Sequence, residues 1–226
     1  MVLYSGTPCQ IEGLYSFLRK EYINLYTINL SCHGVPSPKI WKNYLDENTN
    51  GIDKVEKIEF RNKRNSWRKF RIVIKSNKTI NNIHYDDPYF LGFLYNIYLR
   101  PSCYNCIYKK NMFKADFTLA DCWHIDKKAL FDINKGVSLV LVNTNKGFEL
   151  IKKIIPFSII NEVSIEDALN SNNGLKQYTD KPLIRDKFFT LIQHNGLSQT
   201  IIKILIPSFS RRIVFKIKKY IHNVIS

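Results

Sequence analysis

The sequence lacks several features that define specialised classes of protein. No stretch approaches the roughly 18 consecutive apolar residues of a membrane-spanning helix, and no basic segment followed by an apolar run and a cleavage site opens the chain. Acidic residues are scarce, because 19 Asp and Glu stand against 34 Lys and Arg and leave a net charge of +15. We therefore expect a cytoplasmic protein whose excess positive charge faces an acidic partner, nucleic acid or an anionic membrane surface.

The composition is otherwise that of an ordinary globular protein. Of the 226 residues, 45% are hydrophobic and 23% are charged, which excludes a disordered or collagen-like chain. The chain has no internal repeat and no low-complexity segment. Its length predicts one domain, or one domain with a short appendage.

Cysteine is also rare, and its odd count argues against a disulfide framework in a chain without a visible export signal. The five cysteines are Cys9, Cys32, Cys103, Cys106 and Cys122. Cys103 and Cys106 form a C-x-x-C pair, a spacing that lets two thiolates from one tight turn bind a single metal ion or cluster. A redox pair and half of a zinc site are alternative interpretations of this pair alone.

Two strand–turn–helix patterns put two further cysteines at equivalent positions. Residues 2–21 and 25–47 each read as an apolar strand, a turn and a helix, with Cys9 and Cys32 in the turns. In α/β sheets such turns lie at the carboxyl edge, where ligands bind. With the C-x-x-C pair they supply four sulfurs, enough for a tetrahedral metal or a cubane cluster. Alternatively, they are small buried hydrophobic residues, as we predict for Cys122 in mid-strand.

The remaining pattern predicts a mixed fold. Alternating apolar residues over 55–80 indicate an antiparallel hairpin with a basic connection. Strands are expected at 116–121 and 137–142, and a helix over about 147–155 follows the second. The predicted fold class is therefore α/β (mixed α+β), with a parallel-rich mixed sheet flanked by helices, a β-hairpin insertion and a helical C-terminal tail.

The periodicity weakens after residue 156, so we expect one domain over 1–156 and a helical, basic C-terminal extension over 157–226. Near the end, apolar residues recur at helical spacing over 209–225 with Lys and Arg between them. A basic amphipathic helix of this kind can contact an anionic membrane peripherally, or dock onto its own domain or an acidic ferredoxin. Nucleic acid is not expected as a partner, because no recognised nucleic-acid-binding module accompanies the charge.

Six segments match, in order, a pattern known from one family. They are residues 2–11, 32–37, 60–63 with Trp67, 99–106, 116–121 and 136–139. The most distinctive are Ser-Gly-Thr-Pro-Cys-Gln at 5–10, Cys-His-Gly-Val-Pro-Ser at 32–37 and Arg-Pro-Ser-Cys-Tyr-Asn-Cys at 100–106. With these segments the chain resembles the C-terminal domain of the coenzyme F-420 (deazaflavin) hydrogenase/dehydrogenase beta-subunit family.

The resemblance implies an iron–sulfur flavoprotein oxidoreductase. Its relatives pass electrons between FAD, 4Fe-4S clusters and a soluble carrier, either a deazaflavin or a ferredoxin. By this resemblance, Cys9, Cys32, Cys103 and Cys106 hold one 4Fe-4S cluster. The division of labour is physically sensible, because a flavin exchanges two electrons with an organic carrier and a cluster exchanges one.

The resemblance also suggests which residues bind the flavin. The turn formed by Ser5, Gly6, Thr7 and Pro8 is expected to bring backbone groups to the flavin or its phosphates, although it can equally be no more than a tight turn. Asp121, at the end of a predicted strand, is expected to orient a flavin or ribose hydroxyl, with a helix N-cap as the alternative.

The chain departs from the family pattern in ways that keep a second function open. No ferredoxin-like segment with closely spaced cysteines precedes residue 2, so we expect a truncated chain that receives electrons from a separate ferredoxin-like subunit. The family's Gly-Asp-Phe-Trp-Gly is Ala-Asp-Cys-Trp-His at 120–124, without either glycine. The alternative function is a non-catalytic remnant or assembly partner, linked for example to surface-polysaccharide synthesis.

Overall fold

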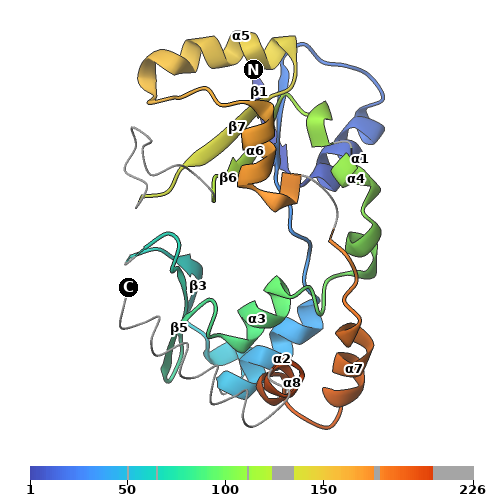
Figure 1. Ribbon diagram of the computed structural model, residues 1–226, viewed down its shortest axis with the longest axis vertical. Helices are drawn as coiled ribbons and strands as arrows, with labels where there is room; N and C mark the ends of the chain where they lie inside the picture. The colour runs from blue at the N-terminus through green and yellow to red at the C-terminus, as the bar shows by residue number, and fades with distance from the viewer. Residues whose placement is uncertain (50, 65, 111, 124–134, 176–178, 206–226) are drawn as a thin grey trace. The chain divides into compact units, whose positions relative to one another are not determined.

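The computed structural model describes residues 1–49, 51–64, 66–110, 112–123, 135–175 and 179–205. The chain divides into two compact units, each assembled from two stretches of sequence (Figure 1). The first unit consists of Met1–Gly34 and Pro101–Asp180, and the second of Val35–Arg100 and Lys181–Ser226. The predicted boundary at residue 156 stays a prediction, and the basic helix predicted over 209–225 lies outside the described residues.

The first unit is built on a four-stranded mixed sheet with the strand order β1-β2-β6-β7. The strands are β1 (Val2–Gly6), β2 (Leu25–Leu30), β6 (Phe117–Asp121) and β7 (Ser138–Val142). β1, β2 and β6 run parallel, and β7 pairs antiparallel with β6. The parallel-rich mixed sheet predicted from the apolar runs is confirmed.

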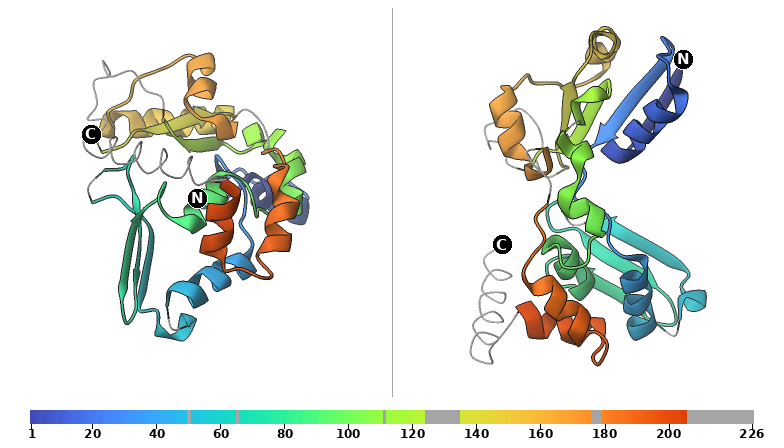
Figure 2. Two further views of the ribbon diagram at one scale, coloured as in Figure 1. Left: turned by 60° about the horizontal axis from the view of Figure 1, so that its bottom comes forward. Right: turned by 90° about the vertical axis from the view of Figure 1, so that its right-hand side faces the viewer.

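Helices flank this sheet, as predicted (Figure 2). The longer ones are α1 (Pro8–Leu18), α5 (Asn145–Ile154) and α6 (Ile165–Ser171); shorter turns are η2 (Pro101–Asn105), α4 (Ile107–Lys110), η3 (Met112–Lys114), η4 (Ile155–Phe157) and η5 (Asn173–Leu175). α1 packs on β1 and β2, and α5 packs on β7. Leu139 and Leu141 of β7 form a small core with Ala168 of α6 and Leu175 of η5.

The ends of the helices follow local chemistry that the sequence already contains. Thr7 and Thr144 are the N-caps of α1 and α5, and the Thr144 hydroxyl accepts a hydrogen bond from Gly147 N at 3.0 Å. Pro8 occupies the first turn of α1, where its missing N–H has no consequence. The predicted strand–turn–helix units are therefore confirmed, and α5 begins two residues earlier than the expected 147.

The second unit contains an antiparallel sheet in the order β3-β4-β5. Its strands are β3 (Lys57–Asn62), β4 (Arg71–Lys75) and β5 (Thr79–Ile83). The hairpin predicted over 55–80 is confirmed, and β5 adds a third strand to it. The helices are α2 (Pro38–Asn48), η1 (Ile52–Lys54), α3 (Pro88–Leu94), α7 (Ile184–Leu191) and α8 (Leu197–Leu205), so the C-terminal region is helical as predicted.

The core of the second unit is rich in aromatic rings arranged around one buried carboxylate. Asp87 is the N-cap of α3 and accepts hydrogen bonds from the backbone N–H groups of Tyr89 and Phe90. Its other oxygen accepts from the Tyr44 hydroxyl at 2.5 Å and from Asn82 Nδ2 at 3.0 Å. Burial of this acid is therefore offset by a full set of donors.

None of the described helices is long and apolar enough to cross a membrane.

Candidate functional site

All four cysteines of the predicted ligand set belong to the first unit. Cys9 lies in the first turn of α1, directly after β1, and Cys32 follows the end of β2 by two residues. Because β1 and β2 are parallel, both cysteines lie at the carboxyl edge of the sheet, as the sequence predicts. Cys103 lies within η2, and Cys106 directly precedes α4.

The four cysteines form no disulfide, and they differ in exposure. Cys9 is exposed, whereas Cys32, Cys103 and Cys106 are half-buried. The Cys9 Sγ lies 3.1 Å from the Thr7 hydroxyl, so a polar contact holds this thiol at the N-terminus of α1.

Electrostatic interactions connect the cysteines from different segments. Burial raises the pKa of the Cys32 thiol, while Lys109 and a backbone hydrogen bond with Gly34 lower it. Cys103 and Cys9 both add to the rise in the pKa of Cys32, because each is close enough for its negative charge to oppose that of Cys32. Cys32 therefore interacts with thiols of both other segments, which lie far from it in sequence.

Lys109 lies among these thiols and was not singled out by the sequence. Its side chain is 6% exposed, and burial lowers its pKa, whereas Cys32, Cys106 and Cys103 act in the opposite direction. Its backbone N–H donates to Cys106 O at 3.3 Å, and its Nζ donates to His33 O at 3.4 Å. Lys109 thus connects the C-x-x-C segment to the turn that carries Cys32.

The thiols are not arranged around a single point. Within the described part of the chain, no group of three or more His, Cys, Asp or Glu side chains could hold one metal ion. A structural zinc site needs four tetrahedral ligands about one ion. The shared ligand role of Cys9, Cys32, Cys103 and Cys106 therefore stays a prediction.

The turn predicted to contact the flavin is already occupied by its own contacts. Ser5 and Gly6 are the last residues of β1, and Thr7 N donates to Gln10 Oε1 at 2.9 Å. Pro8 has no N–H, so it offers an anion no hydrogen-bond donor. To bind a flavin at this turn, the Thr7 N–H would have to give up its hydrogen bond with Gln10 and donate to the ligand instead. The predicted cofactor role of residues 5–8 stays a prediction.

Asp121 ends β6 at the same carboxyl edge, where a buried asparagine connects neighbouring elements. Asn172 Nδ2 donates to Asp121 O at 2.8 Å, and its Oδ1 accepts from Ser31 Oγ at 3.2 Å and Gly174 N at 2.9 Å. A Cβ on Gly174 would come within 2.5 Å of Ser31 Oγ, so this close approach requires glycine. The flavin role of Asp121 also stays a prediction.

Comparison with known proteins gives one family. Residues 1–168 match the family of the C-terminal region of the coenzyme F420 hydrogenase/dehydrogenase beta subunit. The chain belongs to this family. The resemblance carried by the six sequence segments is confirmed, and the match includes all five cysteines.

Similarity beyond the family match is distant. A solved structure of the F420-reducing [NiFe] hydrogenase complex from Methanosarcina barkeri shares 17% sequence identity with this family member, at a TM-score of 0.42. The alignment covers 90% of this chain and 58% of that one, so the chain spans little more than half of the length of this neighbour. No curated protein matches.

Cys122 lies outside the candidate site of this beta-subunit family member. It packs against the core formed by Leu139, Leu141, Ala168 and Leu175, which fits the predicted structural role. The expectation that it lies in mid-strand is wrong, because β6 ends at Asp121. Its N–H still donates to Val137 O at 3.0 Å and extends the pairing of β6 with β7. His124, in the same motif, lies outside the described residues.

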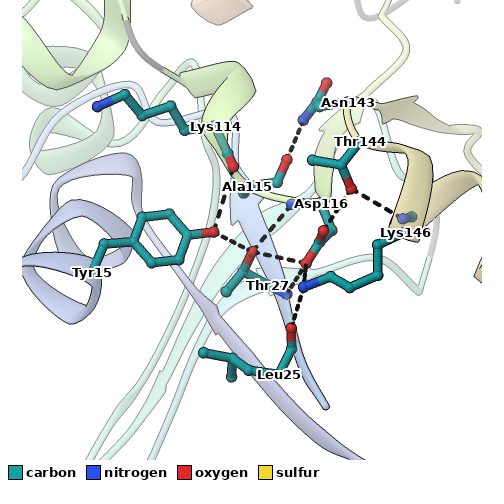
Figure 3. A network of polar contacts seen from close by, with 10 residues as sticks. Tyr15, Leu25, Thr27, Lys114, Ala115, Asp116, Asn143, Thr144 and Lys146 are labelled. Carbon is teal, nitrogen blue, oxygen red and sulfur yellow. Dashed lines mark hydrogen bonds and ion pairs between the residues drawn. The ribbon is translucent and has the colours of Figure 1, made fainter. Parts of the chain in front are cut away.

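The amino edge of the sheet carries a separate polar network, seen close by in Figure 3. Asp116, which directly precedes β6, accepts from Thr27 N at 2.9 Å and from the Thr144 hydroxyl at 2.6 Å. Lys146 Nζ lies 3.2 Å from the same carboxylate, and the Thr27 hydroxyl lies 2.6 Å from that of Tyr15. A cavity of about 920 Å³ is bordered by four of them, Tyr15, Asp116, Thr144 and Lys146. The network joins β2, β6 and α5, and its carboxylate has a full set of partners.

Proposed function

We propose that this chain is an iron–sulfur flavoprotein subunit that passes electrons between FAD, a 4Fe-4S cluster and a soluble carrier of the deazaflavin or ferredoxin type. The observation that supports this most directly is that Cys9 and Cys32 lie at the same edge of the sheet, each just after one of the parallel strands β1 and β2. The family match over residues 1–168 gives the chemical context.

The chemistry of the donor set fits an iron–sulfur cluster. Four cysteines from three segments of the first unit form no disulfide, and thiolate is the ligand that such clusters use. A cubane cluster also spreads its ligands over a larger volume than a single ion. The lack of a single-ion arrangement in the described residues is therefore compatible with a cluster.

In the proposed reaction, the protein's own residues would hold the cluster, orient the flavin and shield both from water. Cys9, Cys32, Cys103 and Cys106 would hold the cluster, which supplies one-electron transfer when bound. Residues 5–8 and Asp121, at the carboxyl ends of β1 and β6, would hold the flavin beside it. Tyr104, buried between the two cysteines of the C-x-x-C pair, would help to exclude water.

A partner is needed to deliver or remove electrons. Cys9 is exposed, so a cluster bound through it would lie near the surface and within reach of a docked carrier. A net charge of +15 favours an acidic carrier such as a ferredoxin-like protein. We further propose a cytoplasmic location, with peripheral membrane contact through residues 209–225.

Anaerobic purification followed by iron, sulfide and flavin analysis tests the proposal. We expect about four iron and four sulfide per chain, a brown protein and stoichiometric FAD. The Cys103→Ser/Cys106→Ser variant should lose the iron. The matched Cys122→Ser variant should keep it, because Cys122 packs in the apolar core.

A colourless wild-type protein with one equivalent of zinc would contradict the proposal. So would iron retention in the double variant. Zinc alone would favour the second candidate, a non-catalytic assembly partner, which the departures at 120–124 also favour. Iron retained in the double variant would instead show that Cys103 and Cys106 do not hold it.

A further inference from the structure

The antiparallel sheet of the second unit carries more than half of the chain's excess positive charge (Figure 1). From the start of β3 to the turn before β5, at residues 57–64 and 66–78, nine Lys and Arg stand against one acid, Glu59, and contribute +8 to the net +15. We call this segment the basic hairpin. Seven of its nine basic side chains are exposed, and the other two are half-buried. Glu59 is itself paired within the hairpin, because Lys57 Nζ lies 2.5 Å from its carboxylate.

Two exposed arginines of the basic hairpin are held over buried aromatic rings. Arg61 Cζ lies 4.9 Å from the centre of the Phe70 ring. Arg68 Cζ lies 5.7 Å from the centre of the Trp67 ring. Phe70 and Trp67 are only 8% and 2% exposed, so the rings are fixed by the core of the unit. A guanidinium on such a ring keeps its planar fork of donors in a restricted position, and this fork matches the geometry of a carboxylate.

The burial of these rings narrows the choice of partner. Proteins that bind single-stranded nucleic acid stack its bases on exposed aromatic rings, but the two rings beneath the arginines are buried. Phe60 of β3 is 42% exposed, yet its ring packs against that of Trp41 with 4.8 Å between the centres. Surfaces that insert into a membrane present exposed apolar side chains beside their cations, whereas the loop at 63–64 and 66–69 has only the buried Trp67. A partner recognised by its carboxylates fits these features best.

We propose that the basic hairpin is the docking surface for the acidic, ferredoxin-like carrier protein. Charge complementarity carries this choice, because an acidic surface is attracted to the +8 of the hairpin. A second copy of the chain would bring +15 against it and be repelled. The identity of the carrier rests on the proposed function. The docking itself depends on charge and is measurable on a chain that holds neither cluster nor flavin.

The test compares two double variants with the same change in net charge. Lys63→Glu/Lys75→Glu reverses two exposed charges of the hairpin and leaves both ring-bound arginines in place. Lys39→Glu/Lys187→Glu is the matched control, because these exposed lysines lie on α2 and α7 of the same unit. Circular dichroism checks that each variant folds. Arg64→Glu, at another exposed position of the hairpin, replaces the first variant should that one not fold.

Calorimetry measures the binding of a purified, acidic plant-type ferredoxin to each full-length protein. At an ionic strength of about 0.1 M, charges more than about 10 Å apart are screened, so local charges dominate. There we expect the hairpin variant to bind about tenfold more weakly than the wild type, and the control less than about twofold more weakly. At about 1 M the difference should vanish. Single-stranded DNA, duplex DNA and phosphatidylserine vesicles are titrated in parallel.

Several results would overturn the docking surface. The wild type would fail to bind the ferredoxin, or both double variants would weaken binding equally, which would assign the effect to net charge and not to the hairpin. Tighter, hairpin-dependent binding of DNA or vesicles would show that the partner is not an acidic protein.

Failure of this inference is distinguishable from failure of the proposed function. A chain that takes up no iron but binds the ferredoxin through the hairpin refutes the proposed function and supports the docking surface. A chain that holds a cluster but binds the ferredoxin equally well in the hairpin variant refutes the docking surface alone.

Discussion

The two edges of the sheet in the first unit each carry a lysine, but the surroundings of the two lysines differ. At the amino edge, Lys146 lies 3.2 Å from the buried carboxylate of Asp116, in a network where each charge has a partner (Figure 3). At the carboxyl edge, Lys109 is buried more deeply and faces three thiols. The amino edge therefore pairs a buried carboxylate with a lysine, whereas the carboxyl edge has a buried lysine near thiols.

The difference indicates that the amino edge stabilises the fold, whereas the carboxyl edge carries the candidate site. A carboxylate surrounded by donors from β2 and α5 holds elements together and needs nothing further. Lys109 instead connects the C-x-x-C segment to the turn after β2 through a long hydrogen bond from Nζ to His33 O at 3.4 Å. The contrast can be tested by changing each edge separately.

The largest effect is expected at the amino edge, from Asp116→Ala. This substitution removes the ion pair of Lys146 and the acceptor of the Thr27 and Thr144 donors, and we expect a loss of about 3–5 kcal/mol in the free energy of unfolding. Urea denaturation followed by circular dichroism measures it. Glu149→Ala, which breaks the exposed ion pair with Lys152, is the control and should cost less than about 1 kcal/mol. Similar losses in the two variants would show that the network is not structural.

Much of this arrangement, but not its contacts, is predictable from the sequence. Apolar runs followed by Thr7-Pro8 and Ser37-Pro38 predict two strand–turn–helix units because N-caps and first-turn prolines act locally. The equivalent position of Cys9 and Cys32 follows from the parallel strands. Strand pairing at the amino edge brings together Thr27 and Asp116, 89 residues apart, and no local pattern encodes that contact.

Lys109 marks the limit of sequence-based prediction for the candidate site. It stands beside Lys110 in a chain with 34 Lys and Arg, so composition makes it one basic residue among many. Only the burial of its side chain, decided by packing of α4 near the turn after β2, distinguishes it. The cysteines were identifiable because their spacing is specific, whereas a lysine near them has no fixed spacing.

A second prediction sets the two lysines directly against each other in metal-free protein. Lys146→Met removes the partner of a buried carboxylate and should destabilise the chain by about 1–3 kcal/mol. Lys109→Met replaces a buried ammonium that lacks a carboxylate partner among the described residues, so we expect no loss or a gain of about 1 kcal/mol. Urea denaturation of both variants under anaerobic, iron-free conditions provides the measurement. Equal destabilisation by the two substitutions would remove the distinction between the edges.

The smallest expected effect concerns the alkaline stability of the amino edge. Burial raises the pKa of Tyr15 above its ordinary value of 10.0, and the nearby charge of Asp116 adds to the rise, although the hydrogen bond with Thr27 lowers it. Because the folded-state pKa lies above the unfolded one, the contribution of this phenol is fully present below pH 10 and is lost as the pH rises through the folded pKa. The free energy of unfolding of Tyr15→Phe should therefore fall less steeply above pH 10 than that of the wild type. The same substitution at Tyr95, which is 56% exposed, should leave the slope unchanged, and an equal change in both variants would exclude the network around Asp116 as its origin.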